Sequence, residues 1–213
     1  MEQIIVSSKN LKKILKVAEK VIKQRGVIIC PTDTVYGLIA DASNETAVKK
    51  VFKIKKRTSK KPSPVFVKDI KTAKKLAIIN KTQERFLKRV WPGKITIVLK
   101  AKKKRLSKGI LSKEGKIGLR IPNYKLINLL LKKLNRPLTG TSANISGKKE
   151  STKIKEVIKQ FQNQKHQPDL ILDAGNLKPS LSSTVIDLTN FKILREGQVS
   201  KKEISKIFNN LIR

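Results

Sequence analysis

The sequence has very few cysteine, histidine and aromatic side chains. Among 213 residues there is one cysteine, Cys30, and one histidine, His166, and aromatic residues make up only 4% of the chain. A single cysteine excludes an internal disulfide and a cysteine-rich zinc site, and the lack of histidine argues against a His-centred triad and a transition-metal site. We therefore expect no metal ligands from the protein, and few rings for stacking on single-stranded RNA.

Long apolar runs, linkers and repeats are also missing. No stretch approaches 18 apolar residues, and the first residues, MEQIIVSSKN, lack the basic start and apolar core of a signal peptide. No Pro/Gly/Ser-rich linker or internal period divides the chain, and its length fits one full core. We predict a cytoplasmic protein with no membrane partner, in which residues 1–213 form a single domain.

Acidic residues are scarce relative to basic ones. The chain has 50 Lys and Arg against 15 Asp and Glu, which gives a formal net charge of +35. A field of this strength attracts nucleic acid without any sequence-specific site. An A/T-biased genome would explain the preference for lysine over arginine, but it does not explain the shortage of acids. We therefore expect tRNA or another RNA as a partner.

Short β-rich runs alternate with amphipathic helical patterns along the chain. In residues 11–24, apolar side chains recur at i, i+3, i+4 and i+7, so one stripe faces a sheet while lysines cover the other side. The pattern predicts an α/β fold: a twisted, mixed sheet of parallel and antiparallel strands with flanking helices. Strands are expected at 4–6, 27–30, 65–67, 95–100, 116–121, 138–141, 170–173, 183–187 and 192–194, and further helices at 45–56, 70–77, 82–90, 124–134, 153–161 and 201–212.

Five polar stretches fall at expected strand ends or in loops, where α/β proteins keep their sites. They are PTDTVYG, KIKKRTSKKPSP, GLRIP, TSANISG, and LSSTVID with LREG. Their hydroxyls, amides and cations suit the recognition of phosphates and the stabilisation of charge in phosphoryl or nucleotidyl transfer. No GxxxxGK[ST] or GxGxxG motif occurs, so the phosphate site is of another kind than a P-loop or a Rossmann turn.

The stretches PTDTVYGL, KIKKR…KP, WPGKIT, GLRIP, TSANISG, SSTVID and LREG resemble, in sequence and in order, the YrdC-like family of L-threonylcarbamoyladenylate synthases. The resemblance runs from about Ile14 to Gly197. It implies a YrdC-like fold in the short form, without the C-terminal extension domain of longer members. It also implies an enzyme that joins L-threonine, bicarbonate and ATP into threonylcarbamoyl-AMP and pyrophosphate, with magnesium on the phosphates. The product would go to a threonylcarbamoyl-transferase complex that modifies tRNA.

The resemblance also assigns roles to individual residues. Lys55 and Arg57 would hold the triphosphate and absorb charge as the carbamate oxygen attacks the α-phosphorus. Ser142 and Asn144 would bind ATP and complete this catalytic group. The remaining assignments are Thr34, Arg120 and Ser183 as contacts of L-threonine, Thr32 and Tyr36 as residues that shape its pocket, and Arg195 as a nucleotide contact. Lys61 and Phe66 stand where some relatives carry an Asn and a His.

Two other functions compete with this one. A basic RNA-binding or ribosome-assembly factor on the same fold would explain the charge, but it would have no use for Lys55, Arg57, Ser142 and Asn144. A paralogue with a different carbamoyl acceptor would keep that group and alter the amino-acid pocket. Threonine-dependent release of pyrophosphate from ATP separates the three.

Overall fold

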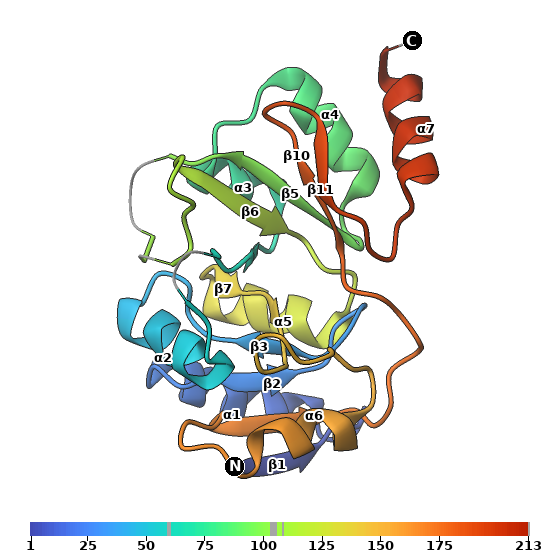
Figure 1. Ribbon diagram of the computed structural model, residues 1–213. Coiled ribbons are helices and arrows are strands. Elements are labelled where there is room, and N and C mark those ends of the chain that lie inside the picture. The colour runs from blue at the N-terminus through green and yellow to red at the C-terminus, as the bar shows by residue number, and fades with distance from the viewer. Residues whose placement is uncertain (59–60, 103–105, 108, 213) are drawn as a thin grey trace.

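The computed structural model describes residues 1–58, 61–102, 106–107 and 109–212, and over these residues it contains two β-sheets and seven helices (Figure 1). Residues 59 and 60, inside the second polar stretch, lie outside the described residues. The expected mixture of parallel and antiparallel strands with flanking helices is confirmed. The strands are divided between two sheets, however, where the sequence pattern suggested one. The helices are α1 (Leu11–Lys23), α2 (Glu45–Lys55), α3 (Ile70–Leu76), α4 (Lys81–Val90), α5 (Lys125–Leu134), α6 (Ile154–Phe161) and α7 (Lys201–Ile212).

The first sheet, sheet A, is covered by helices on both faces. Its order is β1 (Glu2–Ile5), β9 (Leu170–Asp173), β2 (Ile28–Cys30), β3 (Gly37–Ile39) and β8 (Thr141–Ser142). Side chains of α1 and α5 pack on one face with Ile28 and Ile39, and side chains of α2 and α6 pack on the other with Ile29 and Leu38. Because successive strand residues point to opposite faces and helices cover both faces, every apolar side chain of β2 is buried.

The second sheet, sheet B, has one covered face and one open face. Its order is β11 (Lys192–Arg195), β10 (Thr184–Asp187), β5 (Ile95–Lys100), β6 (Lys116–Arg120), β4 (Val65–Phe66) and β7 (Leu138–Thr139). Ile95, Ile97 and Leu99 pack in one core with apolar residues of α3, α4 and α7. The alternate residues of the same strand, Thr96 and Val98, line a cavity on the opposite face.

The strand expected at 138–141 is in fact two strands in different sheets. β7 pairs with β4 in sheet B, and β8 pairs with β3 in sheet A, with Gly140 between them. A Cβ atom on Gly140 would overlap the ring of Phe66. The absence of a side chain therefore lets the chain cross closely from one sheet to the other.

Two smaller differences concern strand bounds. The first strand lies at Glu2–Ile5 rather than 4–6. The strand β3 was not expected, because it begins at the last residue of the polar stretch PTDTVYG. Within the part of the chain that the structure describes, no helix has the length and apolar character needed to cross a membrane.

Candidate active site

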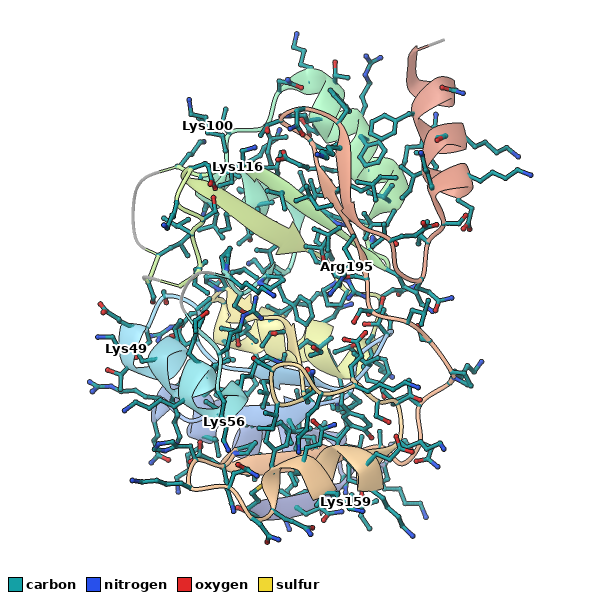
Figure 2. The ribbon with its side chains drawn as sticks, viewed as in Figure 1. Lys49, Lys56, Lys100, Lys116, Lys159 and Arg195 are labelled. Carbon is teal, nitrogen blue, oxygen red and sulfur yellow. The ribbon has the colours of Figure 1, made fainter. Side chains whose placement is uncertain are left out.

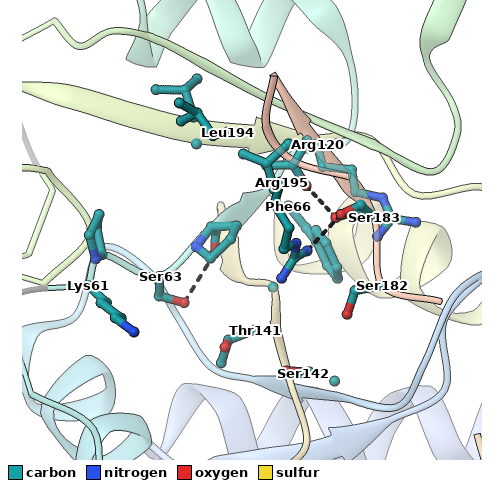
Figure 3. A pocket seen from close by; sticks show the side chains of 18 of the residues that line it. Lys61, Ser63, Phe66, Arg120, Thr141, Ser142, Ser182, Ser183, Leu194 and Arg195 are labelled. Atoms are coloured by element: carbon teal, nitrogen blue, oxygen red, sulfur yellow. Dashed lines mark hydrogen bonds between the residues drawn. The ribbon is translucent and has the colours of Figure 1, made fainter. Parts of the chain in front are cut away.

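A cavity of about 790 Å³ lies between the open face of sheet B and the edge of sheet A. Its floor is formed by alternate residues of β5, β6 and β10, and its opposite wall by the β2–β3 loop, β8 and residues 61–64. All but two of the ten expected site residues line it, and Figure 3 shows several of them around the same space. They are Thr32, Thr34, Tyr36, Arg57, Arg120, Ser142, Ser183 and Arg195.

Arg120 is held rigidly in the cavity wall by three partners. Its Nε donates to the Gly93 carbonyl at 2.8 Å, and its Nη1 donates to Thr34 Oγ1 at 3.2 Å. Its Nη2 forms an ion pair with Asp33 Oδ1 at 2.6 Å, with side-chain exposures of 3% and 8%. Burial lowers the pKa of Arg120 and the Asp33 carboxylate opposes that shift. Of the five guanidinium N–H groups, one on each terminal nitrogen has no partner among the described residues, so Arg120 can still receive a carboxylate.

Asp33 is a functional neighbour that the sequence reasoning missed. Its second oxygen, Oδ2, accepts a hydrogen bond from the backbone N–H of Asn123 at 3.0 Å. Asp33 is the carboxylate within the stretch PTDTVYG, which was expected to contribute to the site, but sequence reasoning assigned it no individual role. Asp33 therefore connects the β2–β3 loop to the segment that follows β6.

Thr32 and Tyr36 use their hydroxyls within the protein. Thr32 Oγ1 donates to the Val35 carbonyl at 2.7 Å and accepts from the Thr34 N–H at 3.1 Å, which fixes the turn that presents Thr34. Tyr36 OH donates to the Gly175 carbonyl at 2.6 Å, and burial raises the pKa of Tyr36. Both residues thus contribute to the shape of the pocket.

Lys55 and Asn144 lie behind the cavity wall, in a closed hydrogen-bond network with Ser142. Lys55 Nζ donates to the Ser142 carbonyl at 2.5 Å and to both the carbonyl and Oδ1 of Asn144 at 2.9 Å. Asn144 Oδ1 also accepts from Ser142 Oγ at 2.7 Å, and its Nδ2 donates to the carbonyls of Ile145 and Lys148. The three N–H groups of the ammonium and all four sites of the amide are occupied.

The network has an electrostatic consequence at the C-terminal end of α2. Burial, with a smaller contribution from Arg57, lowers the pKa of Lys55 to about 7, while Glu150 raises it. The backbone N–H of Ser146 also donates to the Lys55 carbonyl at 2.8 Å. In this conformation Lys55 holds the Ser142–Lys148 loop in shape, whereas the Ser142 side chain lines the cavity.

Arg57 reaches the cavity from just beyond α2. Its Nη1 donates to Thr141 Oγ1 at 3.2 Å and its Nη2 to the Pro62 carbonyl at 2.9 Å. Its buried Nε has no hydrogen-bond partner among the described residues. Burial and the nearby Arg195 lower the pKa of Arg57. Arg57 and Arg195 have no ion pair with a carboxylate among the described residues, and two such arginines held close together are suited to an anion with several charges.

Ser183 and Arg195 form the end of the cavity next to Arg120. Ser183 Oγ shares a 2.8 Å hydrogen bond with Thr96 Oγ1, and Arg195 Nη2 donates to the Ser183 carbonyl at 2.7 Å (Figure 3). Ser182 beside them bonds through its Oγ to Glu150. The strap before β10 is therefore attached to the loop before α6.

The cavity also contains lining residues to which sequence reasoning assigned no role. Lys61 and Phe66 both line it, together with Thr141 and Ser182. Thr141 and Ser182 lie inside the polar stretches TSANISG and LSSTVID, so the sequence indicated their neighbourhood although not the residues themselves. The far end of the floor holds Val98, Ser112, Glu114, Lys116, Gly118, Val185, Asp187 and Leu194.

Comparison with known proteins gives a consistent family. The family profile Sua5, YciO and YrdC, described as telomere recombination, matches residues 20–197. A Methanocaldococcus jannaschii protein, named provisionally as a threonylcarbamoyl-AMP synthase, is 38% identical over 197 residues, which are 92% of this chain and 91% of that protein. The threonylcarbamoyl-AMP synthase of Pyrococcus abyssi is 32% identical over 200 residues.

Solved structures agree with the sequence comparisons. The crystal structure of P. abyssi Sua5 complexed with L-threonine aligns with a TM-score of 0.86 at 31% identity and covers 97% of this chain. The crystal structure of Escherichia coli YciO aligns at 0.81 with 24% identity, which indicates the shared fold. The chain spans 60% of the P. abyssi Sua5 structure and 58% of the curated P. abyssi sequence.

Proposed function

Since this chain belongs to the Sua5, YciO and YrdC family, we propose that it is a single YrdC-like domain that forms threonylcarbamoyl-AMP and pyrophosphate from L-threonine, bicarbonate and ATP. The proposal is supported by the similarity to the threonylcarbamoyl-AMP synthases and to the L-threonine complex of P. abyssi Sua5. It identifies the enzyme as a nucleotidyltransferase.

One observation carries the proposal: two kinds of subsite open into the same cavity. Arg120, with Thr34 and Ser183 nearby, suits a small molecule that has a carboxylate and a hydroxyl. Arg57 and Arg195, with the Ser142 hydroxyl, suit a polyphosphate. An enzyme that joins an amino acid to a nucleotide needs these two subsites side by side.

The chemistry follows from this arrangement. The neutral amine of threonine attacks the carbon of bicarbonate. The two combine to N-carboxythreonine, and water is lost. The carbamate oxygen of that species then attacks the α-phosphorus of ATP, and the bond between the α-phosphorus and the bridging oxygen of the leaving pyrophosphate breaks. Arg120 orients the amino acid, and Arg57 and Arg195 stabilise the charge that develops on the phosphate oxygens.

Magnesium would act here as part of the ATP substrate. Mg²⁺ prefers oxygen ligands, keeps several waters and is commonly bound through substrate phosphates. Over the described residues no group of three or more His, Cys, Asp or Glu side chains could hold a metal ion. We therefore propose that phosphate oxygens and water hold the ion, which neutralises charge on the leaving pyrophosphate.

RNA is the further partner that the charge favours. The chain has 50 Lys and Arg against 15 Asp and Glu, so an excess of 35 positive charges remains even if every carboxylate neutralises one cation. Figure 2 shows the labelled lysines Lys49 and Lys159 at the outside of the half that contains sheet A. We propose tRNA or another RNA as a partner, a transferase complex as recipient of the product, and the cytoplasm as the location.

The decisive experiment supplies purified protein with ATP, magnesium, bicarbonate and each amino acid in turn, and follows pyrophosphate release. We expect release only with threonine and bicarbonate together. Arg57→Ala should lower the rate by about 2–4 kcal/mol of transition-state stabilisation, whereas Lys53→Ala, which removes an exposed lysine of α2, should leave it unchanged. Release without bicarbonate would indicate direct adenylation of the amino acid, and preference for another amino acid would indicate a paralogue.

The alternative function, a protein that only binds RNA, is tested with a double variant of the same protein. Ser142→Ala with Asn144→Ala should weaken ATP binding by about 1.5–3 kcal/mol for the lost bond from Ser142 to a charged ligand, and further through the loop shape that the Asn144 hydrogen bonds maintain. It should not change RNA affinity in filter binding, because neither side chain is charged. Loss of RNA binding with retained ATP turnover would mean that this loop reads RNA.

A further inference from the structure

The strap, residues 174–183, connects the two sheets beside the cavity. It leaves sheet A at the end of β9 and enters sheet B at the start of β10 (Figure 1). Its last two residues, Ser182 and Ser183, line the cavity and are 8% and 7% exposed. Ser183 is one of the three residues assigned to L-threonine. The position of the strap therefore decides where one wall of the amino-acid subsite lies.

The strap is held separately at its two ends. At the sheet A end, Tyr36 OH donates to the Gly175 carbonyl at 2.6 Å. At the sheet B end, the N–H of Leu181 donates to Gln198 Oε1 at 2.8 Å. Residues 178 and 179 between these anchors are exposed. A further contact is therefore needed to hold the cavity-lining end of the strap against the opposite wall.

One side chain of the opposite wall makes that contact. Glu150 belongs to the loop between β8 and α6, and its Oε1 accepts from the Ser182 N–H at 3.3 Å and from the Ser182 hydroxyl. Among the described residues Glu150 has no ion pair, and its other oxygen, Oε2, accepts no hydrogen bond. Within the same part of the chain it does not line the cavity. Glu150 therefore acts on a ligand through Ser182.

The loop that carries Glu150 is braced independently of the strap. Lys55 Nζ donates to the Asn144 carbonyl at 2.9 Å, and Gln160 Nε2 of α6 donates to the Lys149 carbonyl at 2.9 Å. These hydrogen bonds do not involve the Glu150 side chain. The loop therefore offers a fixed point to which the carboxylate ties the strap, and it should keep its shape when that carboxylate is removed.

From this geometry we infer that Glu150 is a positioning residue of the amino-acid subsite: by holding Ser182 against the loop of the nucleotide subsite, it fixes Ser183 opposite Arg120 and Thr34. The inference rests on the proposed function for its ligand. It adds a residue that does not touch threonine but decides how closely the wall of the subsite fits it.

The size of the effect depends on what else holds Ser183. Its Oγ shares a 2.8 Å hydrogen bond with Thr96 Oγ1, and its carbonyl accepts from Arg195 at 2.7 Å. Misplacement of a binding group by about 1 Å can cost about 100-fold. Because these two bonds limit the movement, we expect Glu150→Ala to weaken threonine binding by about tenfold. In pyrophosphate release the KM for threonine should rise by the same factor, with kcat nearly unchanged.

Glu150→Gln separates the hydrogen bond from the charge. The amide oxygen can accept both bonds from Ser182, and the amide nitrogen takes the place of Oε2. Both variants remove the negative charge that raises the pKa of Lys55, so a difference between them reports the hydrogen bond. Glu150→Gln should keep threonine affinity within about threefold of the parent. The matched control is Glu156→Ala, which removes an exposed carboxylate that accepts from Ser151 at 2.6 Å in the same loop; it should leave threonine affinity unchanged.

Two measurements test the inference. L-threonine, ATP and inorganic tripolyphosphate are titrated calorimetrically into each variant, and hydrogen exchange of residues 180–183 is followed by mass spectrometry. The inference requires that Glu150→Ala weakens threonine binding alone and speeds exchange in the strap, and that Glu150→Gln does neither. Unchanged threonine affinity in Glu150→Ala, or equal losses for all three ligands, would overturn it. Equal losses of threonine affinity in both variants with normal exchange would also overturn it, because the carboxylate would then bind the ammonium group of threonine directly.

Hydrogen exchange needs no ligand, so this inference and the proposed function fail separately. If exchange and threonine affinity change as expected but the parent releases no threonine-dependent pyrophosphate, the positioning role stands and the proposed function fails. If the parent releases pyrophosphate with threonine but Glu150→Ala shows normal exchange and affinity, only the positioning role fails.

Discussion

The buried ion pair between Asp33 and Arg120 gives the sharpest energetic test of this site. Asp33→Asn keeps the size of the side chain but removes its charge. The guanidinium then remains in an interior position, 3% exposed, with only neutral partners at Gly93 and Thr34. Breaking a buried pair from one side costs about 3–5 kcal/mol, because it leaves an uncompensated charge. This is a large part of the 5–15 kcal/mol that typically stabilises a domain.

A double-mutant cycle separates this cause from simple loss of packing. Arg120→Met leaves Asp33 unpaired and should destabilise by a similar amount. Asp33→Asn with Arg120→Met removes both charges and should cost no more than either single change, so we expect a coupling energy of about 3 kcal/mol. The assay is urea unfolding followed by circular dichroism at one pH and salt concentration.

The cycle also has results that would refute the reasoning. Additive effects would mean that the pair does not act as a unit, and single changes below about 1 kcal/mol would mean that water solvates the guanidinium. In the folded Asp33→Asn variant we expect weaker threonine binding and unchanged tripolyphosphate binding, because Arg120 is the cavity cation with which Asp33 pairs. Equal losses for both ligands would show a general defect of the cavity.

Three further outcomes follow from the structure. The difference in unfolding free energy between the parent and Lys55→Met should rise from pH 7 to about pH 10, by up to about 1.4 kcal/mol per pH unit. The folded protein releases the Lys55 proton near pH 7 and the unfolded chain holds it to higher pH; a flat difference in urea titrations would contradict this. Gly140→Ala should destabilise by about 1–3 kcal/mol, because its Cβ overlaps the Phe66 ring, whereas Gly118→Ala should be far milder in the same thermal melts. RNA affinity should fall log-linearly with salt, with a slope of about 0.7–0.9 per phosphate contact, and a salt-independent affinity would remove RNA phosphate as the ligand.

Local sequence patterns were sufficient for the helices and for most strands. The helical stripe of Ile14, Ala18 and Ile22 is buried as expected, because a period of 3.6 residues identifies the face that a helix presents to a core. The bounds of β5 and β9 agree with their apolar runs. The resemblance to the YrdC-like family, drawn from short stretches in a fixed order, is confirmed.

The sequence also identified most residues of the cavity, because polar side chains at strand ends and in loops of α/β proteins commonly belong to a binding site. It could not say which of them face the ligand. Lys55 and Asn144 belong to the same motifs as Arg57 and Ser142, yet they lie behind the wall and satisfy one another. Which partner a long side chain finds depends on the position of segments almost ninety residues away in the chain.

The division into two sheets and the pairing of distant charges were decided by tertiary structure alone. Nothing in residues 138–142 marks a change of sheet except Gly140, whose bare Cα matters only because Phe66 packs against it. Asp187 and Lys116 likewise meet only because β5 lies between β10 and β6. Alternation and composition are local properties that the sequence carries by itself, whereas contacts between distant segments exist only once the strands have taken their order.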